Sequence, residues 1–167
     1  MISNQTCITL ALGSNLGDRC ANLCQALNEL SAQVSINKTS SIYETPPWGF
    51  IEQPVFLNQV ISGNTALSPH ELLTFLKGIE QEMGRIKNFQ NGPRLIDIDI
   101  LLYGEKIIHT ADLVIPHPRM LERGFVLLPL VEIEPELVIP GTNKSVFVFL
   151  QKTDQTGIFK ISPEGIK

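Results

Sequence analysis

The sequence predicts an α+β fold in which strands and helices follow one another in the order β-α-β-β-α-β. Three observations lead to this prediction: short apolar segments of strand length, two segments with apolar residues at helical spacing, and turn-rich sequences between them. The chain has 167 residues, of which 43% are hydrophobic, and this is enough to build one substantial core. We therefore expect residues 1–167 to form a single domain.

The first half of the chain contains three of the expected strands. The first, over residues 7–12, ends at the turn-rich segment Gly13-Ser14-Asn15-Leu16-Gly17-Asp18. The helix that follows presents one apolar face, formed by Cys20, Leu23, Cys24, Leu27 and Leu30. A second strand is expected over residues 40–44, because Pro46 and Pro47 lack the backbone donors that would extend it. The third strand is expected over residues 56–62.

The second helix has the clearest start signal in the chain. Ser68 and Glu71 can form a capping box, and Pro69 occupies the first helical position. The apolar stripe of this helix is Leu72, Leu76, Ile79 and Met83, and Gly84 ends it. A fourth strand is expected over residues 95–103. Two antiparallel strand pairs with helices on one face form a ferredoxin-like sandwich, which is the fold we predict.

The C-terminal part is less regular, and we expect additional elements there. It contains a Pro-His-Pro turn at residues 116–118 and an apolar run over residues 125–131 that Pro129 interrupts. Residues 146–150 have the composition of a strand, and a short helix is the alternative.

Charge and composition exclude several functional classes. A net charge of −4 and a pI near 5.4 argue against a protein that binds nucleic acid through a broad basic surface. No segment approaches the roughly twenty apolar residues of a membrane span, and the N-terminus does not resemble a signal peptide. The three cysteines form no Cys-x-x-Cys motif and suit a reducing compartment. We expect a cytoplasmic monomer that acts on small molecules.

Asp97 and Asp99 form an Asp-x-Asp pair inside a segment that otherwise resembles a buried strand. Because strand side chains alternate, the two carboxylates share one face and the intervening isoleucines take the other. Their Cα atoms would lie about 6–7 Å apart, so both carboxylates can converge on one or two cations. The like charges require Mg²⁺ or a nearby arginine such as Arg94, since one carboxyl would otherwise have its pKa raised. The alternative is an edge strand with a solvated acidic face.

Four motifs, in the same order along residues 7–140, resemble those of the 6-hydroxymethyl-7,8-dihydropterin pyrophosphokinases of folate biosynthesis. The motifs are Ala11-Leu12-Gly13-Ser14-Asn15-Leu16-Gly17-Asp18, Ser41-Ile42-Tyr43-Glu44-Thr45-Pro46-Pro47 with Phe56-Leu57-Asn58, Gly92-Pro93-Arg94-Leu95-Ile96-Asp97-Ile98-Asp99, and Pro116-His117 with Arg123-Gly124-Phe125. The resemblance implies an enzyme that transfers pyrophosphate from ATP to the pterin hydroxymethyl group and releases AMP. The common phosphate-binding signatures do not occur, so metal ions and arginines would have to hold the nucleotide.

The resemblance also implies roles for individual residues. Asp97 and Asp99 would bind two Mg²⁺ ions, and Arg85 and Arg94 would stabilise charge on the transferred phosphates. The residues implied for the ATP site are Lys77, Lys87, Ile100, His117 and Arg123. The residues implied for the pterin site are Thr45, Pro46, Trp48, Phe56, Asn58 and Phe125, with the ring between the two phenylalanines. Such chemistry depends on positioning and charge neutralisation more than on a covalent nucleophile.

The sequence also allows other interpretations of these residues and of the function. Phe56 and Phe125 could be core aromatics, and His117 could be a turn residue that bonds to the backbone. Lys87 stands where many family members have arginine, and Asn91 where tryptophan is common. A polymerase-β-like nucleotidyltransferase also pairs Gly-Ser with Asp-x-Asp, but on neighbouring segments. A non-catalytic ferredoxin-like regulatory module would leave the carboxylates and arginines unexplained.

Overall fold

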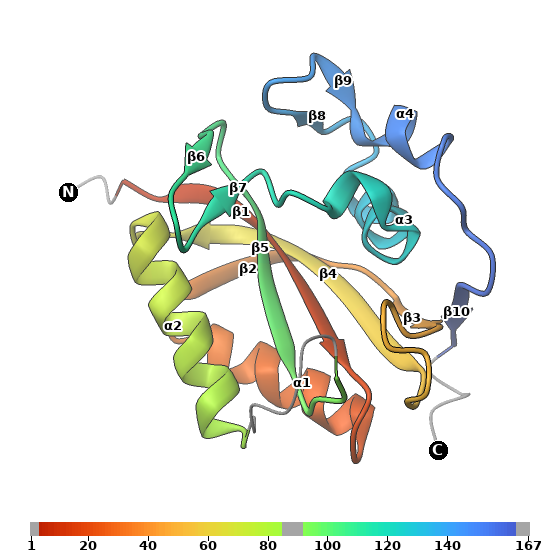
Figure 1. The fold of residues 1–167 in the computed structure, drawn as a ribbon. Coiled ribbons are helices and arrows are strands. Elements are labelled where there is room, and N and C mark those ends of the chain that lie inside the picture. Colours follow the sequence, from red (N-terminus) through yellow and green to blue (C-terminus); the bar gives the residue numbers. More distant parts are fainter. Residues whose placement is uncertain (1–3, 85–91, 163–167) are drawn as a thin grey trace.

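The computed structural model describes residues 4–84 and 92–162 (Figure 1). Its main sheet has the strand order β10-β3-β4-β1-β5, with β2 also paired to β4, and every pair in it is antiparallel. The strands of this sheet are β1 (Thr6–Ser14), β2 (Val34–Thr39), β3 (Ile42–Thr45), β4 (Phe56–Thr65), β5 (Asp97–Tyr103) and β10 (Phe159–Ile161). The central order β4-β1-β5, with β2 and β3 beyond β4, confirms the predicted ferredoxin-like sandwich.

The predicted second strand, over residues 40–44, corresponds to β3, and β2 precedes it as a strand that was not predicted. β2 pairs with the C-terminal half of β4 and β3 with its N-terminal end, and residues 40 and 41 separate them. Ser40 fits this break because its hydroxyl accepts a bond from the Val60 amide and its own amide donates to the Val60 carbonyl. Most of β2 is polar and exposed, so the sequence contained no apolar signal for it.

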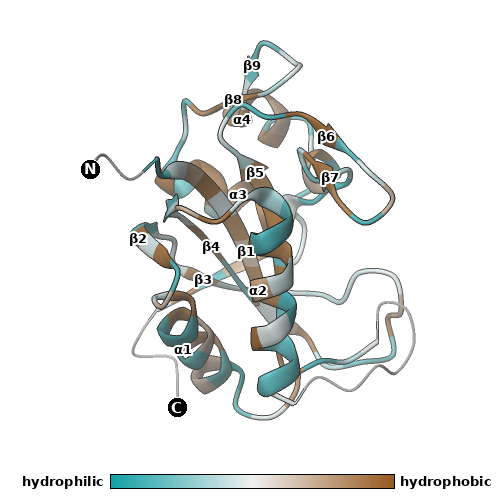
Figure 2. Ribbon diagram, turned by 90° about the vertical axis from the view of Figure 1, so that its left-hand side faces the viewer, coloured by the Kyte–Doolittle hydropathy of each residue, from teal (hydrophilic) through white to brown (hydrophobic). Residues whose placement is uncertain are grey.

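Two helices, α1 (Arg19–Leu30) and α2 (Pro69–Glu82), pack on one face of the sheet. The predicted capping box of α2 is present, with reciprocal bonds between Ser68 and Glu71. The face of α1 differs from the prediction, because Cys24 is exposed and Ala26 is buried in its place. Figure 2 shows hydrophobic strands in the interior and hydrophilic turns on the outer sides of both helices.

The opposite face of the sheet packs against α3 (Gly124–Ile133) and α4 (Val146–Leu150). Residues 146–150 are therefore helical, and the favoured strand prediction for them was wrong. The reason is that Val146 and Leu150, one helical turn apart, are both buried in the core that α3 also contributes to. Pro129 lies inside α3, where it removes one intrahelical hydrogen bond without ending the helix.

Short elements complete the chain. They are β6 (Ile108–His109), β7 (Val114–Ile115), the 3₁₀ turn Met120–Glu122, β8 (Val138–Ile139) and β9 (Lys144–Ser145). β10 pairs with the outer edge of β3 and was not predicted. Within the described ranges, no helix has the length and apolarity needed to cross a membrane.

Candidate active site

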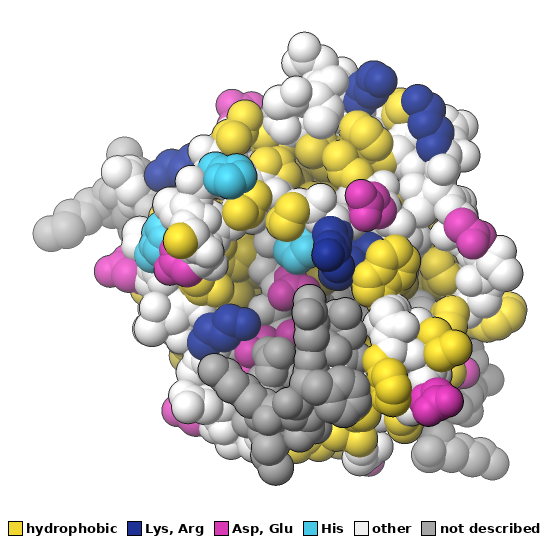
Figure 3. Space-filling view, in the orientation of Figure 1, with side chains coloured by type: hydrophobic (Ala, Val, Ile, Leu, Met, Phe, Trp, Pro, Cys, Tyr) yellow, Lys and Arg dark blue, Asp and Glu magenta, His cyan; other side chains and the backbone are white. Residues whose placement is uncertain are grey.

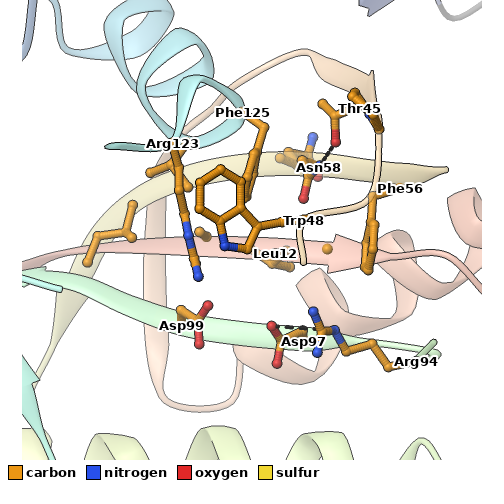
Figure 4. Close-up of a pocket in the computed structure, with 16 residues that line it drawn as sticks. Leu12, Thr45, Trp48, Phe56, Asn58, Arg94, Asp97, Asp99, Arg123 and Phe125 are labelled. Atoms are coloured by element: carbon orange, nitrogen blue, oxygen red, sulfur yellow. Dashed lines mark hydrogen bonds and ion pairs between the residues drawn. The ribbon is translucent and has the colours of Figure 1, made fainter. Parts of the chain in front are cut away.

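β5 positions the Asp-x-Asp pair as the alternation of strand side chains predicted. Ile96 and Ile98 are 0% and 2% exposed in the core under α1 and α2. Asp97 and Asp99 project from the opposite face of the sheet into a pocket beside α3 (Figure 4). The local sequence therefore determines which way the carboxylates face, because reversing them would bury two charges among leucines.

The pocket lies between the loop of residues 46–55, the start of α3 and the exposed surface of β1, β4 and β5. It brings together ten residues predicted for the site: Thr45, Pro46, Trp48, Phe56, Asn58, Arg94, Asp97, Asp99, Arg123 and Phe125. They come from four separate stretches of sequence. Ala11, Leu12 and Gly13 of β1 also line the pocket.

Aromatic rings and guanidinium groups form much of the pocket lining. Trp48 and Phe125 have ring centroids 6.2 Å apart at an interplanar angle of 57°. The Arg123 guanidinium lies 5.7 Å from the Trp48 ring centroid and 5.6 Å from that of Phe125. Arg94 lies 5.3 Å from the centroid of Phe56. Such rings offer apolar faces to a flat ligand, and the adjacent cations favour one that carries negative charge.

Asn58 supplies a fixed polar group in this lining. Its Nδ2 donates to Thr45 Oγ1 at 2.5 Å, and this orients the side-chain amide (Figure 4). Gly13 on the neighbouring strand makes room for it, since a Cβ there would lie 2.9 Å from Asn58 Oδ1. The amide can therefore present its oxygen as an acceptor at a defined position.

Within the described residues, Arg94 and Arg123 carry positive charge close to the carboxylate pair. The Arg94 Nε atom lies 3.7 Å from Asp97 Oδ2. Burial, followed by the charge of Asp97, raises the pKa of Asp99 to about 7, although Arg123 opposes the shift. A divalent cation would relieve this repulsion, and carboxylate oxygens are the ligands that Mg²⁺ prefers. Within the described ranges no group of three or more His, Cys, Asp or Glu side chains could hold a metal.

Three buried polar atoms of pocket residues have no hydrogen-bond partner within the described part of the chain. They are Arg94 Nε, Arg123 Nε and Gln59 Oε1. Arg94 Nε already forms an ion pair with Asp97, so Arg123 Nε and Gln59 Oε1 are the atoms of this set that a ligand in the pocket would satisfy. Gln59 was not predicted for the site, because its position within a buried strand resembles that of its core neighbours.

A second hollow lies on the other side of Asp99. Its lining contains the predicted residues Lys77, Asp99, Ile100 and His117, together with residues 111–114. Burial, helped by the Arg123 charge, lowers the pKa of His117 to about 4, so its ring is neutral at pH 7. Its Nδ1 accepts from the Arg119 amide at 3.2 Å, which leaves the proton on Nε2. Figure 3 shows acidic, basic and histidine side chains close together on this face.

Two predicted residues, Arg85 and Lys87, lie outside the described residues, as does Asn91. Besides Gln59, two further residues near the site, Glu80 and Asn15, were not among those predicted for it. Glu80 is 1% exposed, and its Oε1 accepts from the Ile98 amide at 2.8 Å, directly behind the carboxylate pair. The signal was present, because Glu80 follows Leu72 and Leu76 at the helical spacing of four. Asn15, discussed below, is the other.

Comparisons with known proteins agree with this geometry. Residues 9–135 match the family 7,8-dihydro-6-hydroxymethylpterin-pyrophosphokinase (HPPK). The chain is 46% identical over 142 residues to the 2-amino-4-hydroxy-6-hydroxymethyldihydropteridine pyrophosphokinase of Aquifex aeolicus, covering 85% of this chain and 89% of that protein. It is 43% identical over 157 residues to the folic acid synthesis protein fol1 of Pneumocystis carinii, covering 93% of this chain.

The chain spans only about a fifth of the length of the Pneumocystis and Dictyostelium folic acid synthesis proteins that it matches. The fold is similar to a crystal structure of Plasmodium falciparum HPPK-DHPS with pteroate, with a TM-score of 0.72. That match covers 89% of this chain and 42% of the other, at 17% identity, and so concerns the fold alone. The family match and the identity to the Aquifex protein together show that the chain belongs to the 7,8-dihydro-6-hydroxymethylpterin-pyrophosphokinase family.

Proposed function

We propose that this protein transfers pyrophosphate from ATP to the hydroxymethyl group of 6-hydroxymethyl-7,8-dihydropterin, giving the pterin diphosphate and AMP in folate synthesis. One observation carries the proposal beyond family membership: Asp99 lines both hollows. A cation on this carboxylate would lie between a flat, aromatic site on one side and a site with Lys77 and His117 on the other. Transfer between two bound substrates requires such an arrangement.

The pterin fits the aromatic pocket. Phe56 and Phe125 would contact the faces of its ring. Asn58 and the backbone around Thr45 and Pro46 would form hydrogen bonds with the polar atoms at its edge. Trp48 lies against Phe125 and would form part of the same wall. That these residues line one pocket supports the assignments, and substitution of Phe125, considered in the Discussion, tests them.

ATP fits the second hollow and the junction at Asp99. Lys77 would contact the nucleotide as a point charge, Ile100 by apolar contact, and the neutral His117 would donate from Nε2. Arg94 and Arg123, whose Nε atoms lack hydrogen-bond partners within the described ranges, would bind phosphate oxygens. We also retain Arg85 and Lys87 as proposed phosphate ligands on the strength of the sequence resemblance.

Asp97 and Asp99 would hold two Mg²⁺ ions. When bound, these ions would neutralise the triphosphate and polarise the attacking hydroxyl. The protein's own contribution is positional: Arg94 holds Asp97 by an ion pair, and β5 places Asp99 between the two hollows. No step requires a covalent nucleophile, and none of the described residues that line the pocket is serine or cysteine.

The remaining proposals concern the whole molecule. We propose that residues 1–167 act as a single monomeric domain in the cytoplasm. The three free cysteines support a reducing compartment. Light scattering after gel filtration tests the proposed monomeric state. A main species with twice the mass of the chain would contradict it.

The decisive experiment is a mass-spectrometric assay of the protein with ATP, Mg²⁺ and 6-hydroxymethyl-7,8-dihydropterin. We expect equal amounts of AMP and pterin diphosphate, and no product in EDTA. ADP with pterin monophosphate would contradict pyrophosphate transfer. Free pyrophosphate with an adenylated pterin would instead indicate a nucleotidyltransferase, and Mg²⁺-dependent ATP binding without any product would indicate a regulatory module.

A further inference from the structure

The turn after β1 has no role in the proposed reaction, although its sequence is one of the family motifs. Asn15 lies in this turn and is only 2% exposed. Its side chain makes three hydrogen bonds, all to segments distant in sequence. Nδ2 donates to Gln53 Oε1 at 2.9 Å and to the Pro54 carbonyl at 3.0 Å, and Oδ1 accepts from the Arg94 amide at 2.9 Å. The Asn15 amide also donates to the Arg94 carbonyl at 3.1 Å.

These partners belong to opposite sides of the site. Gln53 and Pro54 end the loop of residues 46–55, which carries Trp48 and leads directly into Phe56. Arg94 pairs with Asp97 on the side of the carboxylates. The two sides also meet directly, because the Arg94 guanidinium lies over the Phe56 ring. Asn15 therefore connects the backbones of two segments whose side chains contact each other in the pocket.

Asparagine suits this place because its amide donates and accepts at once. Aspartate would keep the acceptor for the Arg94 amide but would place a carboxylate against Gln53 Oε1 and the Pro54 carbonyl. Asn22 provides a contrast, since its Nδ2 donates to Ser14 Oγ and the Leu16 carbonyl within the same turn. Asn22 thus stabilises the turn itself, whereas Asn15 joins the turn to the site.

We propose that Asn15 is a positioning residue that couples the two substrate sites. A pterin that orders the 46–55 loop would also order Arg94 through Asn15, and phosphates that bind Arg94 would order the loop in return. The coupling is reciprocal, because each ligand must change the affinity of the other by the same factor. This inference rests on the proposed function, since it needs both substrates to bind.

The test is calorimetric titration of 6-hydroxymethylpterin with and without Mg²⁺ and α,β-methylene-ATP. The ratio of the two pterin dissociation constants is the coupling factor. Loss of the two donated bonds in Asn15→Asp should reduce this factor by about tenfold. Asn22→Asp, which adds the same charge in α1 beside this turn, should keep the parental factor. The chain's single tryptophan, Trp48, lies in the pocket, so its fluorescence gives an independent measure of pterin binding.

The outcomes separate this inference from the proposed function. A parent protein that binds neither ligand contradicts the function and the coupling together. A parent that forms AMP and pterin diphosphate, with Asn15→Asp keeping the coupling factor within twofold, overturns the role of Asn15 alone. If thermal denaturation shows that Asn15→Asp does not fold, Gln53→Met replaces it, because this side chain lies on the surface loop. Gln53→Met should lower the factor about threefold, and an unchanged factor overturns the proposal.

Discussion

The two faces of the sheet differ in composition and in closure, although the same strands build both. The face under α1 and α2 is closed by a continuous cluster of buried apolar side chains. The face under α3 and α4 has a second apolar cluster at one end and the pocket with Asp97, Asp99 and Arg123 beside it. On β5, adjacent residues serve the two faces in turn. Substitutions on β5 should therefore affect either stability or ligand binding, depending on which face of the sheet the side chain occupies.

The largest expected effect is the loss of turnover in Asp97→Ala and Asp99→Ala. Each substitution removes a proposed metal ligand, so we expect kcat to fall by more than about a hundredfold. The free energy of unfolding should stay the same or rise, because a like-charge contact is removed. Steady-state kinetics and urea unfolding measure the two quantities. Activity within tenfold of the parent in both variants would contradict the metal assignment.

The reverse result is expected for Ile98→Ala, one residue away on the other face. Ile98 is 2% exposed, and truncating it should lower the free energy of unfolding by about 2–5 kcal/mol. Its amide bond to Glu80 belongs to the backbone and survives the substitution. The folded fraction should keep the parental KM for both substrates. A stable Ile98→Ala protein with a large loss of kcat would show that the two faces are not independent.

A smaller, ligand-specific effect is expected for Phe125→Ala. If its ring stacks on the pterin, pterin binding should weaken by about 1–3 kcal/mol while ATP binding changes little. Phe147→Ala is the matched control, because this ring is 46% exposed on α4, away from the pocket. Calorimetric titration of each variant with the pterin and with ATP measures the two affinities separately. Equal pterin affinity in a folded Phe125→Ala protein would return this residue to a purely structural role.

The smallest effect concerns pH. In the metal-free protein the Asp99 carboxyl, with its pKa raised to about 7, binds a proton that competes with Mg²⁺. Apparent Mg²⁺ affinity should therefore fall about tenfold between pH 8 and pH 6. The free energy of unfolding should change in the opposite direction. Between pH 3.8, the ordinary pKa of an aspartate, and about pH 7, Asp99 keeps its proton in the folded state but has released it in the unfolded state. The metal-free protein should therefore lose stability as the pH rises through this range.

Asp99→Asn tests the stability part of the pH prediction, and the parent protein tests the Mg²⁺ part. This variant should remove the component of the stability change between pH 4 and 7 that is due to Asp99, measured by urea unfolding in EDTA. A parent protein whose Mg²⁺ affinity is the same at pH 6 and pH 8 would show that Asp99 is already ionised without metal.

Local sequence patterns were sufficient for α1 and α2, for β1, β3, β4 and β5, and for the direction of the carboxylate pair. Alternation along β5 and the spacing in α2 are properties of consecutive residues, so they can be read without a structure. They were insufficient for β2, β10 and α4. β2 is stabilised by pairing with β4, and β10 by pairing with β3. α4 is stabilised by packing against α3. All of these are contacts between residues distant in sequence, which local patterns do not reveal.

The sequence by itself determined the order of elements, the family and which side chains β5 presents to each face, because these depend on periodicity and on motifs. Only the tertiary structure decided that Asp99 borders two hollows and that Asn15 joins Gln53, Pro54 and Arg94. The Asn15 contacts cross 38 to 79 positions of the chain. Hydrogen bonds over such separations leave no periodic trace, since each partner alone resembles an ordinary turn residue.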